Sequence, residues 1–118
     1  MKKILIVDDE DDIRKAIVLV LQEKGFETIE TNNGGDAFEI TRMRKPDLII
    51  SDIVMDRING FLFHELLQED ERTAAIPLIL MTGHALKDSE WKSHPEVAHL
   101  EKPFSMLVLL DTIERILH

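Results

Sequence analysis

Two stretches of the chain each place carboxylates at the end of a short apolar run. Residues 4–7 (ILIV) are followed by Asp8 and Asp9, and residues 48–50 (LII) are followed closely by Asp52. Such runs are typical of strands buried in a parallel sheet. Ligands bind outside the carboxyl ends of these strands, so an acid there is placed for chemistry. Asp52 alone could simply open the next loop, but the repeated arrangement favours a site.

If the two strands are neighbours, the carboxylates of Asp8, Asp9 and Asp52 converge on one small volume. Carboxylates this close repel one another, so either one stays protonated or a cation holds them together. The chain contains no cysteine, and no histidine stands near these acids in the sequence. Oxygen ligands alone favour a hard cation, and Mg2+ is the ion we expect.

Two later strands are also expected to end on polar residues. Residues 77–81 (PLILM) end at Thr82, and a weaker strand over residues 97–101 is followed by Lys102. The strand ends together supply a cation site, a carboxylate, a hydroxyl and an ammonium group. These groups suit phosphoryl transfer to an aspartate, in which Asp52 attacks phosphorus and the positive groups stabilise the phosphoryl oxygens.

Helical patterns separate the strands. An amphipathic stripe predicts a first helix, built on Ile13, Ala16, Ile17, Val20 and Leu21. A second strand is expected over residues 26–31, a turn over 32–35, and further helices over 36–44, 61–70 and 104–117. Residues 85–96 carry no sustained stripe, and we expect a short, irregular helix there. Strands alternating with helices predict a parallel sheet covered on both faces.

Length and composition limit the possible functions. The 118 residues suit one domain spanning residues 1–118. The formal net charge of -9 argues against direct nucleic-acid binding by this domain, because it would repel the phosphate backbone. No apolar run approaches the thickness of a bilayer and no signal peptide is recognisable, so we expect no membrane association and a cytoplasmic location.

The sequence resembles the receiver domains of response regulators in two-component signalling, including the chemotaxis regulator. The resemblance covers essentially the whole chain and depends on four motifs: residues 6–10 (IVDDE), 46–52 (PDLIISD) with Gly60 beyond them, 81–83 (MTG) and 102–104 (KPF). It implies an α/β, flavodoxin-like fold with a five-stranded parallel sheet in the order 2-1-3-4-5 and helices on both faces.

The resemblance also implies a role for each site residue. Asp52 corresponds to the phosphoryl acceptor. Asp8 and Asp9 correspond to the Mg2+-binding acids, and the backbone carbonyl of Val54 to the group that completes the metal site with them and Asp52. The phosphoryl group would come from a phosphohistidine on a sensor histidine kinase or a phosphotransfer protein. Such a domain assists its own phosphorylation and dephosphorylation but is a signalling domain, not an enzyme.

The remaining implied roles concern the switch between two states. Thr82 corresponds to the hydroxyl that moves toward the phosphoryl group, and Lys102 to the ammonium that pairs with it. The Lys102–Pro103 bond is expected to be cis. His99 stands where the family more often has tyrosine or phenylalanine, the side chain that swings inward when Thr82 moves.

The implied partners, besides the phosphoryl donor, are an unknown output domain or protein. A second copy of the chain could also bind, through the face formed by the fourth helix, fifth strand and fifth helix. That region departs from the family pattern, because residues 82–102 are about two residues shorter than usual and residues 94–96 (HPE) replace a glycine-containing turn. Asp56 and Arg57 likewise replace the usual loop residues beside the cation site.

Several alternatives stay open. A receiver-like docking module would act without phosphorylation. A haloacid-dehalogenase-type phosphatase would need a second aspartate where Val54 stands, and a flavin or nucleotide binder would need a glycine-rich loop after the first strand. His84 could influence hydrolysis of the aspartyl phosphate. His64 and His118 are expected to face solvent, and Met43 to fill the core.

Overall fold

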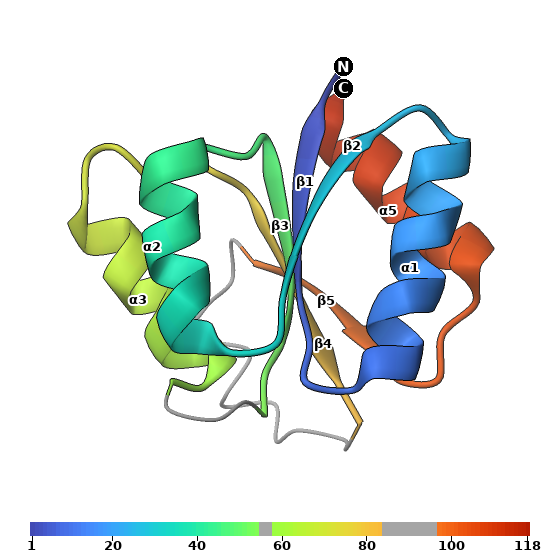
Figure 1. Ribbon diagram of the computed structural model, residues 1–118, viewed down its shortest axis with the longest axis horizontal. Helices are drawn as coiled ribbons and strands as arrows, with labels where there is room; N and C mark the ends of the chain where they lie inside the picture. Colours follow the sequence, from blue (N-terminus) through green and yellow to red (C-terminus); the bar gives the residue numbers. More distant parts are fainter. Residues whose placement is uncertain (55–57, 84–96) are drawn as a thin grey trace.

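The computed structural model of the chain contains a five-stranded parallel sheet, and the description below covers residues 1–54, 58–83 and 97–118. The strands lie in the order β2-β1-β3-β4-β5, as the resemblance implied (Figure 1). Their bounds are Lys3–Val7 for β1, Glu27–Thr31 for β2, Leu48–Asp52 for β3, Leu78–Thr82 for β4 and Ala98–Glu101 for β5.

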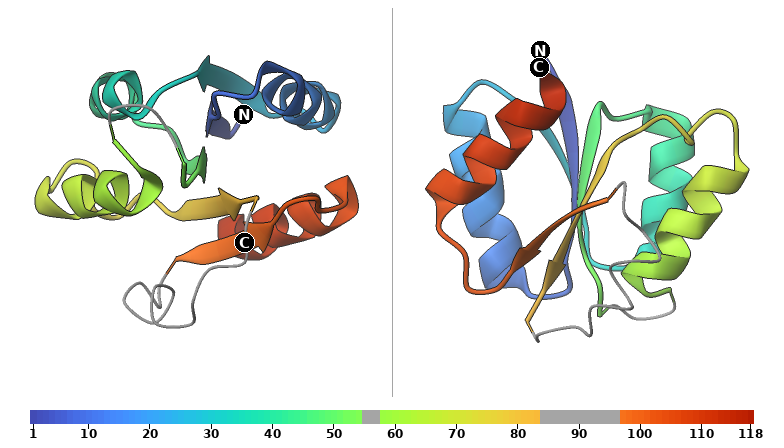
Figure 2. Two further views of the ribbon diagram at one scale, coloured as in Figure 1. Left: turned by 90° about the horizontal axis from the view of Figure 1, so that it is seen from below. Right: turned by 180° about the vertical axis from the view of Figure 1, so that it is seen from behind.

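Helices cover both faces of this sheet. Helices α1 (Asp11–Glu23) and α5 (Met106–Leu117) lie on one face, and α2 (Gly34–Arg44) and α3 (Gly60–Glu69) lie on the other (Figures 1 and 2). Side chains alternate along β1 accordingly: Ile4 and Ile6 join the core beneath α1 and α5, whereas Leu5 and Val7 join the core beneath α2 and α3. All five residues of β3 are buried, so the run that ends at Asp52 is a central strand.

Three helices begin at residues set by their caps. The Asn33 side chain accepts a hydrogen bond of 2.9 Å from the backbone N–H of Asp36, so α2 begins at Gly34 inside the expected turn. The Ser105 hydroxyl caps α5 in the same way, and this helix begins at Met106, not at residue 104. Asn59 caps α3, which begins at Gly60. The expected helix starts were therefore wrong by one or two residues.

Several expectations fall outside the described residues: the irregular helix over 85–96, the departures from the family pattern at residues 94–96, Asp56 and Arg57, and the role of His84. Among the described helices, none is both long enough and apolar enough to span a bilayer.

Candidate functional site

The register of the sheet brings four strand ends to one edge. Val7 pairs with Ser51, Asp52 pairs with Met81, and Thr82 pairs with Glu101. Asp8 directly follows β1, Asp52 and Thr82 are the last residues of β3 and β4, and Lys102 directly follows β5. Parallel strands all end at the same edge, which is why residues far apart in the sequence meet here.

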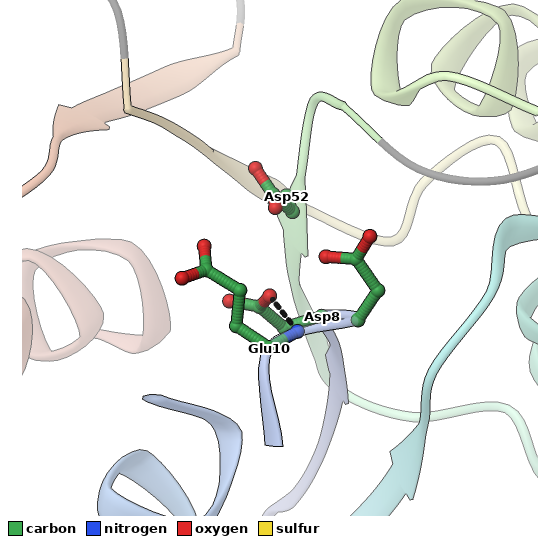
Figure 3. Close-up of side chains that lie close together, drawn as sticks. Asp8, Glu10 and Asp52 are labelled. Atoms are coloured by element: carbon green, nitrogen blue, oxygen red, sulfur yellow. Dashed lines mark hydrogen bonds between the residues drawn. The ribbon is translucent and has the colours of Figure 1, made fainter. Parts of the chain in front are cut away.

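An acidic cluster forms at this edge. Asp8, Asp9, Glu10 and Asp52 each offer a carboxylate oxygen, and these oxygens lie within 4.8 Å of one another. Asp8 and Asp52 are buried, whereas Asp9 and Glu10 are exposed to solvent. Figure 3 shows the side chains of Asp8 and Glu10 gathered beside Asp52. An all-oxygen donor set of this kind fits a hard divalent cation such as Mg2+.

Glu10 is the member of the cluster to which the sequence analysis gave no role. It directly follows Asp9, and its backbone N–H donates a 2.9 Å hydrogen bond to Asp8 Oδ1. Its position next to two expected ligands was the available signal. Residues 8–12 (DDEDD) are all acidic, however, and the sequence does not show which of these side chains turn toward Asp52.

Lys102 lies among these acids as their cationic partner. Its Nζ is 3.0 Å from Asp8 Oδ2, 3.0 Å from Glu10 Oε1 and 3.5 Å from Asp52 Oδ2. Burial opposes the charged ammonium, but hydrogen bonds to Asp8 and Glu10 and the charge of Asp52 outweigh it and raise the pKa of Lys102. The ammonium group therefore compensates part of the repulsion between the carboxylates.

The Lys102 backbone is fixed as well as its side chain. Its N–H donates to the Thr82 carbonyl at 2.6 Å, joining the ends of β5 and β4. The Lys102–Pro103 peptide bond is cis, in agreement with the resemblance.

Asp52 has an unusual protonation equilibrium. Burial raises the pKa of its carboxyl to about 6, Lys102 opposes this rise, and the negative charge of Asp8 adds to it. The carboxylate is thus available near neutral pH, but it is held in an environment that disfavours its charge. A group that neutralises this charge, such as a bound cation or a proton, is favoured here.

The loop after Asp52 is held close to the sheet. The N–H of Ile53 donates to the Met81 carbonyl at 2.9 Å, and the N–H of Gly60 donates to the Ile53 carbonyl at 2.8 Å. An added Cβ at Gly60 would stand 2.9 Å from the Asp52 carbonyl oxygen, 2.9 Å from Ile53 Cα and 2.9 Å from a Leu80 methyl carbon. A side chain here would press against the backbone of Asp52 and Ile53, which explains why the motif has glycine at this position.

The other expected site residues are spread around this edge. Thr82 is buried at the end of β4. Val54 lies two residues after Asp52 in the chain, and its side chain is exposed to solvent. His99 is exposed on β5, opposite Leu80 in the register. His84 lies outside the described residues. The roles expected for these residues stay predictions.

Comparison with known proteins gives the family. Residues 4–114 match the family described as the response regulator receiver domain. The chain is 37% identical to protein PilH of Pseudomonas aeruginosa over 119 aligned positions, which cover 99% of this chain and 98% of that protein. It is 31% identical to the polar-differentiation response regulator DivK of Brucella anthropi over 115 positions, covering 96% of this chain and 94% of DivK.

A solved structure gives the same result. The chemotaxis response regulator CheY4 of Vibrio cholerae superimposes with a TM-score of 0.89 at 29% identity, covering 98% of each chain. The chain therefore belongs to the response regulator receiver domain family, a class of signalling domains in two-component systems.

Proposed function

We propose that this chain accepts a phosphoryl group on Asp52 in a Mg2+-dependent step and thereby changes its affinity for a partner. The observation that carries the proposal is the buried carboxylate of Asp52, 3.5 Å from the Lys102 ammonium and within 4.8 Å of three further carboxylates. Burial disfavours this charge, and a cation bound by the acids would offset both it and the further negative charge that the phosphoryl group brings.

The proposed reaction assigns each group a task. An Asp52 oxygen attacks the phosphorus of a phosphohistidine on a sensor kinase or phosphotransfer protein, the new O–P bond replaces the P–N bond, and the imidazole leaves with its electron pair. Mg2+ held by Asp8, Asp9, Asp52 and the Val54 carbonyl would neutralise phosphoryl oxygens. Lys102 and the Thr82 hydroxyl hold the remaining oxygens, and His99 follows the movement of Thr82.

The cellular location and the partners are also proposed from membership of the family. We place the domain in the cytoplasm, with a kinase or phosphotransfer donor and an output domain or protein as partners. A homodimer through the face that the family forms from its fourth helix, fifth strand and fifth helix is a further proposal.

Intact mass spectrometry tests the central proposal. The parent chain and Asp52→Asn are incubated with acetyl phosphate, with and without Mg2+. We expect a single phosphoryl adduct on the parent that requires Mg2+ and is lost in the variant. If Mg2+ binds and a known receiver reacts in parallel, the absence of an adduct would reject phosphorylation and favour a docking module that acts without it.

A further inference from the structure

Arg14 is a buried cation that the proposed phosphoryl chemistry does not use. It lies in the first turn of α1, and its side chain is only 10% exposed. The guanidinium has three acceptors: Nη1 donates to the backbone carbonyl of Asp8 at 2.7 Å, Nη2 to Asp11 at 2.7 Å and Nε to Glu30 at 3.0 Å. One side chain thus joins the β1–α1 loop, α1 and the end of β2.

Its contact with Asp8 differs from an ordinary surface ion pair. The hydrogen bond from Arg14 to the Asp8 carbonyl is buried, and Asp8 is itself fully buried within the acidic cluster. Exposed ion pairs contribute little to stability, whereas a buried, charge-assisted bond to a main-chain carbonyl restricts the backbone that bears it. The backbone N–H of Asp8 also donates to the Thr31 carbonyl at 3.2 Å, so both of its polar groups are held.

The ion pairs fix the guanidinium in place. Burial opposes the charges of both Arg14 and Glu30, but their hydrogen bonds outweigh it: those from Lys15 and Arg14 lower the pKa of Glu30, and those to Asp11 and Glu30 raise the pKa of Arg14. Arginine suits this position because its planar fork can serve several acceptors at once, which a lysine ammonium on a flexible stem does less well.

We propose that Arg14 is a positioning residue for the cation site: by holding the Asp8 carbonyl, it fixes the β1–α1 loop so that the carboxylates of Asp8 and Asp9 face Asp52. The expected effect on metal binding rests on the proposed function. The hydrogen bond from Arg14 to the Asp8 carbonyl, which motivates the inference, does not depend on a bound metal.

Mg2+ affinity separates this role from simple electrostatics. We compare the parent with Arg14→Met, Arg14→Lys and Lys15→Met, titrating each folded protein with Mg2+ at constant ionic strength and following backbone amides by NMR. Lys15 is the matched control, because it is the next residue on α1 and also pairs with Glu30, at 3.0 Å, but its side chain is 61% exposed. Its ammonium contacts the two carboxylate oxygens of Glu30 and not the Asp8 carbonyl.

The two explanations predict opposite signs. Removing a positive charge near an acidic cluster should, by electrostatics alone, leave Mg2+ binding unchanged or tighter, and we expect this of Lys15→Met. Loss of positioning should weaken binding about 10-fold in Arg14→Met, as for other residues that orient metal ligands, and less in Arg14→Lys. Binding by Arg14→Met that is as tight as in Lys15→Met would overturn the proposal.

Amide hydrogen exchange without metal provides a second, independent readout. The Glu10 N–H is bonded to Asp8 Oδ1 within the loop, and we expect it to exchange faster in both Arg14 variants while the core amide of Ile6 is unchanged. Unchanged Glu10 exchange would also overturn the proposal. If the parent does not bind Mg2+, the metal step of the proposed function fails, and faster Glu10 exchange still supports the positioning role by itself.

Discussion

At the scale of single residues, the positive charge of Lys102 does not fully compensate the negative charges around Asp52. One ammonium faces the carboxylates of Asp8, Glu10 and Asp52. Its attraction is therefore divided among three acids, and it does not fully offset the burial of Asp52, whose pKa is raised to about 6. The apposed carboxylates and the burial of Asp52 therefore make an unfavourable contribution to the free energy of folding, as perturbed carboxyl groups at functional sites commonly do.

The pH dependence of stability should reveal this cost. Asp52 has a pKa of about 6 in the folded protein and about 4 when unfolded, so between these values the folded state binds more protons. Stability contributed by the protonated carboxyl is present below about pH 4 and is lost as the pH rises through about 6. An asparagine side chain does not ionise, so we expect Asp52→Asn to come close to the parent near pH 4 and to exceed its unfolding free energy by about 3 kcal/mol at pH 7.

Urea unfolding of both proteins across this pH range, in a chelator to remove divalent ions, measures the difference. A gap between Asp52→Asn and the parent that stays constant from pH 4 to 7 would mean that ionisation of Asp52 is not its cause. Replacing the exposed Asp111 by asparagine is a suitable control, because this carboxylate lies in the middle of α5 and outside the cluster.

At the scale of elements, Gly60 is the first residue of α3 and packs closely against the backbone at the end of β3. We expect Gly60→Ala to destabilise the fold by about 1–3 kcal/mol, because the new methyl would meet two backbone groups at 2.9 Å that are part of the Asp52 loop. The variant should also accept a phosphoryl group more slowly, since the displaced backbone is that of Asp52 and Ile53.

Gly83→Ala is the matched control for this prediction. An added Cβ at Gly83 meets no atom of the described residues within 4 Å, and we expect its unfolding free energy to stay close to that of the parent. Urea denaturation of both variants decides the matter. Equal stability of Gly60→Ala and the parent would show that the loop relaxes without cost.

The strands and their polar ends could be predicted from the sequence because each depends on a local pattern. The β3 run is apolar and ends at Asp52, and its burial on both faces follows from that composition. The helix starts were less predictable, since an Asn or Ser side chain defines them through one hydrogen bond. Gly34 and Gly35 were predicted to lie in a turn, but they form the first turn of α2, which Asn33 caps.

Side chains whose positions depend on packing between elements were predicted less well. His64 was expected at the surface but is buried, beside Ile76 and Val97, because α3 packs against the segment that leads into β4. Met43 was expected in the core but is 80% exposed on the outer face of α2. Arg14 is buried, although the apolar stripe of α1 gave no sign of it, because its partners come from β2 and the preceding loop.

At the scale of the whole molecule, the charges are unevenly distributed. The run of five acids after β1 lies at the carboxyl edge of the sheet. Several cations lie at or before strand starts, near the opposite edge: Lys2, Lys3, Lys24, Arg44 and Lys45. With a net charge of -9, a cation bound at the carboxyl edge would offset part of the repulsion among these acids and would stabilise the folded state.

Thermal unfolding should therefore respond to Mg2+ far more than to a monovalent salt. A ligand that binds only the folded state adds about 2.7 kcal/mol at a hundredfold excess over its Kd. NaCl of the same ionic strength only screens the repulsion between exposed charges, so we expect a smaller gain in Tm. Asp52→Asn should begin with a higher Tm and gain less from Mg2+, because the variant lacks both the buried charge and one ligand. Equal gains from MgCl2 and NaCl in the parent would show that general screening acts on the net charge and that the four carboxylates at the sheet edge do not bind the cation specifically.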